Sequence, residues 1–268
     1  MKCFKIFFIS ILFIFSCKGG QENQIDNDVD PQEITSIALQ KAKTIYYSLP
    51  TPIETAMVLE NTNVEFNDQF LLPIKNVDFY ETSYKQAIAL GIYISDLSYC
   101  SMYSQNQEAI EYLSTSKKLI QKLGLIDVIT DSVIQQIENN IGDKTDILNI
   151  ISEQYLQVNA YLDENNMNNI STLIILGGYI ESLHIAVKLA DNEENPPIQL
   201  YQIILEQRIP LKDLLELMKL FKNDTFINKK LKDFEELNSI YQKVSNPLNK
   251  EDFTKIYKKV TQIRSNII

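Results

Sequence analysis

Apolar residues recur along most of this chain at the three- and four-residue spacing of one face of an α-helix. The stretch from Pro31 to Ser48 shows the pattern, with Ile34, Ala38 and Ile45 on one face. No segment shows the sustained alternation of apolar and polar residues that is typical of a half-buried strand. The pattern therefore predicts an all-α protein, folded as a multi-helix bundle.

Prolines, glycines and capping residues divide this pattern into separate helices. Asp143 suits a helix N-terminus, Gly124 a helix end, and Pro210 is expected to break a helix. The stretch from Asn61 to Val77, which carries Pro73, is the least regular part of the chain. The expected helices are Pro31–Ser48, Pro52–Leu59, Phe79–Tyr103, Gln105–Leu123, Asp127–Asn140, Asp143–Leu162, Asn169–Ala190, Pro197 to Pro210, Leu211–Phe221, Phe226–Val244 and Lys250–Ile263.

Two of these helices are apolar on nearly every side and share the pattern L-G-x-Y-I-x-x-L, at Leu90–Leu97 and Leu176–Leu183. A glycine inside a helix costs about 1 kcal/mol relative to alanine, but it lets two backbones approach closely. We therefore expect two central helices that cross at Gly91 and Gly177, as the middle of two similar helical halves. The alternative is a chance match between common helix residues.

The first seventeen residues have the features of an export signal. Lys2 and Lys5 precede an apolar run, Ile6–Phe15, that is about half the roughly 20 residues a membrane-spanning helix needs. Ile14-Phe15-Ser16-Cys17 resembles a bacterial lipobox, in which the preceding peptide is removed and the cysteine receives lipid. This predicts a signal peptide at 1–16, lipid on Cys17, and a place in the bacterial cell envelope, at the periplasmic face or the outer surface. An uncleaved transmembrane anchor is the alternative.

Charge and composition then limit the partners. Residues 17–30 hold the lipidated cysteine and a polar, glycine-containing tether, and 31–268 are expected to form a single helical domain. The net charge is −10, and removing 1–16 takes away Lys2 and Lys5 and makes it −12. A surface this acidic excludes nucleic acid as a partner, so contact with the membrane is expected only through the lipid on Cys17.

Asp96 is the most unusual acidic residue, because its neighbours on a helix are apolar groups and three tyrosines. A buried carboxylate must find hydrogen bonds, since an unpaired buried charge is very costly. Two interpretations stay open for Tyr93, Asp96, Tyr99 and Tyr103. They line a polar ligand site, or they form a structural network in which a tyrosine hydroxyl or a helix N-terminus satisfies Asp96.

Glu181 and His184 form an E-x-x-H pair, the spacing that helical di-iron carboxylate proteins use. The chain has one histidine, which excludes a symmetric di-iron site. A mononuclear site of Glu181, His184 and Asp96 remains an alternative and would make the protein a metal-dependent enzyme or a metal carrier. The other interpretation is a hydrogen-bonded helix pair.

Other catalytic patterns are missing from the sequence. It has no G-x-S-x-G, P-loop or dinucleotide-binding fingerprint, and Cys100 has no basic neighbour on its helix, which predicts a buried structural thiol. We therefore expect a non-enzymatic protein without a cofactor that binds a protein or small-molecule partner. A purely structural envelope component fits the same sequence.

Two motifs carry a resemblance to a known group. Ser48-Leu49-Pro50-Thr51-Pro52-Ile53-Glu54 matches S-L-P-x-P-x-E, and Leu90 to Tyr99 matches L-G-x-Y-x-x-D-L-x-Y. In these motifs the chain resembles uncharacterised helical lipoproteins of Bacteroidota. The resemblance implies an exported helical lipoprotein and supplies no activity.

Overall fold

The computed structural model describes residues 40–46, 48–140 and 142–268, and in these it contains helices and no strand. The all-α prediction is confirmed. Residues 40–46 are helical. The further helices are α2 (Pro52–Glu60), α3 (Ser83–Met102), α4 (Asn106–Lys122), α5 (Asp131–Asn140), α6 (Lys144–Glu164), α7 (Asn168–Asn192), α8 (Ile198–Glu206), α9 (Arg208–Leu220), α10 (Thr225–Tyr241) and α11 (Lys250–Ile267).

Local capping chemistry explains several of the helix ends. Asp143 caps α6, where its carboxylate accepts hydrogen bonds from the backbone N–H groups of Thr145 and Asp146. Thr51 and Glu54 form a capping box at the start of α2. Gly124, just beyond α4, has a φ of +73°, which glycine adopts without a steric penalty. These ends lie where the sequence predicts them.

Some predicted boundaries are displaced. The helix expected from Asp127 begins at Asp131, after a turn at 126–128, and the helix expected from Phe79 begins at Ser83. The helix break predicted at Pro210 falls a few residues earlier: α8 ends at Glu206, and Pro210 lies in the first turn of α9. An N–H in the first turn has no partner within its helix, so a proline there removes no hydrogen bond.

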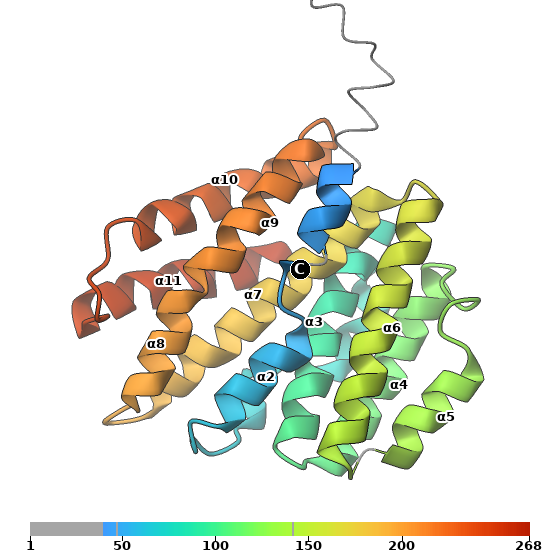
Figure 1. Cartoon of the computed structure of the whole chain (residues 1–268), viewed down its shortest axis with the longest axis horizontal. Helices are drawn as coiled ribbons and strands as arrows, with labels where there is room; N and C mark the ends of the chain where they lie inside the picture. The colour runs from blue at the N-terminus through green and yellow to red at the C-terminus, as the bar shows by residue number, and fades with distance from the viewer. Residues whose placement is uncertain (1–39, 47, 141) are drawn as a thin grey trace, which may run out of the picture.

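The helices α3 and α7 pack against each other through the middle of the molecule (Figure 1). A Cβ added to Gly91 would clash with the backbone carbonyl of Ile174 and lie 2.7 Å from the backbone N of Gly178. A Cβ added to Gly177 would clash with the carbonyl of Ile88. The predicted crossing at the two glycines is confirmed, whereas the two similar halves stay a prediction.

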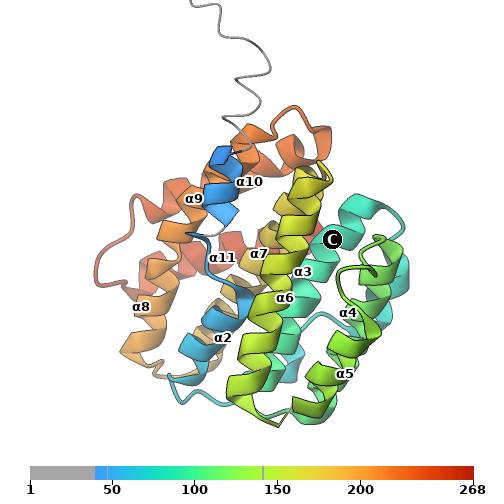
Figure 2. The ribbon, with the colours of Figure 1, turned by 45° about the vertical axis from the view of Figure 1, so that its right-hand side comes forward.

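The other helices surround this central pair. Figure 2 shows α4, α5 and α6 beside α3, and α8 to α11 on the side of α7. Buried side chains from both groups join in one continuous apolar core. The Cys100 thiol is fully buried in α3 and burial raises its pKa, as predicted for a structural thiol.

By length and composition α7 is apolar enough to cross a membrane, but 94% of its most apolar window is buried inside the fold. It is therefore the core helix of the described body. The signal peptide and tether predicted from residues 1–30, Cys17 included, lie outside the described residues.

Candidate functional site

The four side chains predicted to form a ligand site or a polar network lie on α3 and, for Tyr103, directly after its last residue. They face the end of α2 and the irregular segment between α2 and α3. This segment contains two short 3₁₀ turns, η1 (Asp68–Phe70) and η2 (Ile74–Phe79). In the last turn of α2, the Leu59 carbonyl accepts from the Tyr103 hydroxyl at 3.4 Å. The Tyr99 hydroxyl accepts from the backbone N–H of Asn67 at 3.1 Å.

The other two side chains bind the same segment further along. Asp96 Oδ2 accepts from the backbone N–H of Leu72 at 3.1 Å, and the Tyr93 hydroxyl donates to the Pro73 carbonyl at the same distance. The segment therefore runs antiparallel to α3 and is held at successive helical turns. A backbone without regular secondary structure needs such partners when it is buried.

Asp96 also lies beside a buried ion pair. Arg264 on α11 donates to both oxygens of Glu181 on α7, from Nε at 2.6 Å and from Nη2 at 3.0 Å. Asp96 and Glu181 are both fully buried. Burial raises the pKa of Asp96 well above its ordinary value, and the Glu181 carboxylate raises it further, although Arg264 and the Leu72 N–H act in the opposite direction. A protonated Asp96 is able to donate to Glu181.

His184 lies one turn after Glu181 on α7. Burial lowers its pKa to about 4, and this outweighs the opposing effect of Glu181, while Arg264 and Lys188 lower it further. The imidazole is therefore neutral at pH 7, and its Nδ1 has no hydrogen-bond partner among the described residues.

These contacts leave the alternative metal site without enough ligands. Both oxygens of Glu181 bind a guanidinium, which a cation would have to displace. Within 40–46, 48–140 and 142–268, no group of three or more histidine, cysteine or acidic side chains is placed to hold a metal ion. The donor geometry therefore fits a buried structural cluster in which Arg264 binds Glu181 and Asp96 lies beside this pair.

The buried imidazole gives a prediction for stability against pH. An imidazole with a pKa of about 4 in the folded chain and 6.5 when unfolded binds more protons after unfolding. Stability is therefore expected to fall by about 3 kcal/mol as the pH drops from 6.5 to 4. Because folding raises the pKa of Asp96, this residue makes stability fall as the pH rises above the ordinary pKa of an aspartate. Its contribution is expected to be the same in wild type and in a histidine variant, so it cancels when the two are compared.

Denaturant unfolding of wild type and His184→Gln at several pH values would measure the difference. We expect the variant to lose this acid-dependent fall. Parallel curves for the two proteins would show that His184 is protonated as readily in the folded chain as in the unfolded one.

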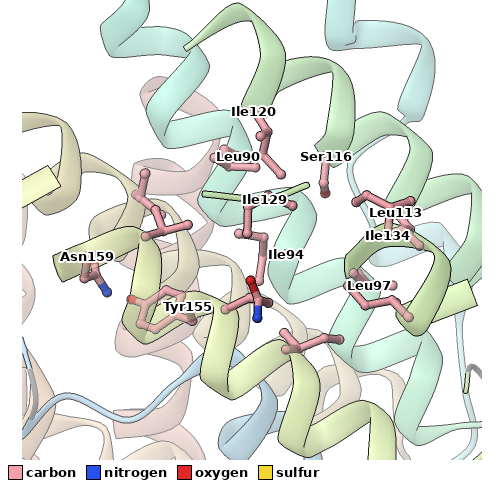
Figure 3. A pocket seen from close by; sticks show the side chains of 15 residues that line it. Leu90, Ile94, Leu97, Leu113, Ser116, Ile120, Ile129, Ile134, Tyr155 and Asn159 are labelled. Carbon is pink, nitrogen blue, oxygen red and sulfur yellow. The ribbon is translucent and has the colours of Figure 1, made fainter. Parts of the chain in front are cut away.

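A separate cavity of about 60 Å³ lies between α3, α4, α5 and α6 (Figure 3). Branched aliphatic side chains make up most of its wall, and no charged residue lines it. The lining residues are Leu90, Ile94, Leu97, Leu113, Ser116, Ile120, Ile129, Ile134, Ile137, Ile151, Gln154, Tyr155, Val158, Asn159 and Ile174. None of the four polar residues predicted as a ligand site is among them.

Three buried polar atoms on this lining have no hydrogen-bond partner in the part of the chain that the structure describes: Ser116 Oγ, Gln154 Oε1 and Asn159 Nδ2. Sequence reasoning missed the cavity, because its walls are ordinary core positions of five helices, α3 to α7, and of the turn before α5. The available signal was weak. It consisted of polar residues, such as Ser116 and Asn159, at buried positions of α4 and α6.

Comparisons of the chain with protein-family models, curated proteins and solved structures find no match. The cavity and the buried charges of this chain are therefore the observations that bear on its function.

Proposed function

We propose that this protein is a lipid-anchored protein of the bacterial cell envelope whose helical body binds a small apolar ligand and performs no catalysis. The observation that carries the proposal is the cavity between α3 and α6, with its apolar wall and its unpartnered polar atoms. Ligand sites in proteins are typically apolar hollows with a few polar groups that orient the ligand.

The size and wall of the cavity limit the ligand. An engineered apolar cavity of about 150 Å³ binds benzene, so one of about 60 Å³ admits a narrower group, such as part of an aliphatic chain. Transfer of apolar surface from water into such a wall is favourable by roughly 25 cal/mol per Å². The ligand is therefore expected to enter with a slender hydrocarbon portion.

The chemistry of the lining supports binding rather than catalysis. Its one titratable group is the Tyr155 phenol, whose pKa burial raises, so it stays protonated. Ser116 has no base beside it on the lining, since His184 lies on a part of α7 that does not line the cavity. A proton-transfer or nucleophilic mechanism needs such a base.

A narrow hydrocarbon probe tests the binding part of the proposal. We expect propane to raise the melting temperature of the purified protein and to shift the NMR signals of cavity methyl groups. Ile134→Phe, which fills the cavity from α5, is expected to abolish both effects. Ile209→Phe, at a position 60% exposed on α9, is the matched control and should keep them. Absence of propane binding to wild type would overturn the proposal.

The anchoring part of the proposal rests on the lipobox pattern at Cys17. We expect Cys17→Ser to leave a protein that takes up no labelled fatty acid and no longer partitions with membranes once its signal is removed. The acidic body gives it no other attraction to anionic lipid. Continued labelling of the variant would contradict the assignment.

A further inference from the structure

We infer that the ligand of this cavity is a neutral amphiphile, a slender hydrocarbon with one hydroxyl-like head group, which Ser116 and Gln154 recognise. This inference rests on the proposed binding function and adds the chemical class of the ligand.

Ser116 differs from other buried hydroxyls of these helices. Ser98, Ser101 and Thr115 each donate to the carbonyl four residues earlier, at 2.7 to 2.8 Å. Within 40–46, 48–140 and 142–268 the Ser116 Oγ has no hydrogen-bond partner, although the residue is only 2% exposed. Figure 3 shows its oxygen turned toward the middle of the cavity. Its hydroxyl is therefore available to a group inside the cavity.

Gln154 supplies a complementary acceptor from α6. Its Oε1 is buried, lies on the same lining and has no partner among the described residues. A buried polar group without a hydrogen bond costs about 1–3 kcal/mol. A ligand hydroxyl is able to accept from Ser116 or to donate to Gln154, and one that did both would satisfy both atoms.

Asn159 is less available than these two residues. Its Oδ1 accepts from the Ser171 hydroxyl at 2.6 Å, which fixes the side chain. Its amide nitrogen lies close to the Tyr155 hydroxyl. We therefore assign the head group to Ser116 and Gln154.

The absence of charged residues from the lining sets the charge of the ligand. A carboxylate or an ammonium group inside this wall would be buried without a counter-ion, which is very costly. A hydroxyl has a much smaller desolvation penalty, and two hydrogen bonds offset it. The head group is therefore neutral.

Four probes of similar length test this inference on the full folded body: propane, ethanol, acetate and ethylammonium. The variant Ser116→Ala/Gln154→Met removes both polar partners and keeps the helical side-chain volume close to that of wild type. We expect it to bind ethanol about five- to tenfold more weakly than wild type does, which corresponds to one or more lost hydrogen bonds. Binding of propane should be unchanged or stronger.

Thr115→Val is the matched control, because this hydroxyl is on the same helix, bonds the Glu111 carbonyl and does not line the cavity. It should leave ethanol binding unchanged. Three results would overturn the inference while the proposed function stands: propane binds but ethanol does not, ethanol binds wild type and the double variant equally, or either ion binds as tightly as ethanol. Failure of propane to bind wild type would instead overturn the proposed function.

Discussion

Gly91→Ala and Gly177→Ala are each expected to destabilise the protein by about 1–3 kcal/mol, and leucine at either position by more. An alanine at an open helical position would stabilise by about 1 kcal/mol relative to glycine, so the sign of the effect is itself diagnostic. The loss is expected because the new Cβ meets a backbone carbonyl, that of Ile174 or of Ile88. These carbonyl groups belong to a helical backbone, so they can move away only if the whole helix moves.

Chemical denaturation of each variant measures this effect, and Gly178→Ala is the neighbouring control. At Gly178 the nearest atom to an added Cβ is a ring carbon of Pro52 at 3.2 Å, a side-chain contact that adjusts more easily. We expect a smaller loss there than at Gly91 or Gly177. A stability equal to or above wild type at both crossing glycines would rule out the close approach of α3 and α7.

Arg264→Met is expected to cost about 3–5 kcal/mol, the range found when one partner of a buried ion pair is removed. Glu181 would then lie in the core, next to Asp96, without the guanidinium that binds both its oxygens. Measurement of the unfolding free energy of the purified variant gives the cost directly.

Two comparisons separate this cause from simple loss of packing. Arg264→Met/Glu181→Met leaves no unpaired charge, so it should be more stable than Arg264→Met alone. Lys259→Met removes another ion-pairing residue of α11, but its partners Asp233 and Glu236 are partly exposed, so a smaller loss is expected. If the double variant is no more stable than Arg264→Met alone, the cost is due to packing and not to charge.

The parts of the fold that follow from local chemistry could be predicted from the sequence. Helix ends such as Asp143 and Gly124 are determined by hydrogen bonds and dihedral angles within a few residues, and the crossing glycines by a repeated motif. The position of Pro210 relative to the helix boundary was predicted wrongly, because a proline that ends a helix and one in the first turn of a helix look alike in sequence.

The contacts of the buried acids could not be predicted in the same way. Asp96 binds the backbone N–H of Leu72 rather than a tyrosine, and Glu181 binds an arginine 83 residues away. Neither contact joins residues three or four positions apart on one helix, because both contacts depend on how distant parts of the chain pack together. The cavity was missed for the same reason, since a void is a property of several helices together.

The Glu181–Arg264 pair also bears on the order in which a growing chain is able to fold. When α7 has been synthesised, the Glu181 carboxylate is already present, but the guanidinium that pairs with it is 83 residues further along. Burying α7 against α3 before that point would place this carboxylate in the core without its cation. Complete docking of α7 on α3 is therefore expected only after α11 has been synthesised, so that the C-terminal helix completes the core.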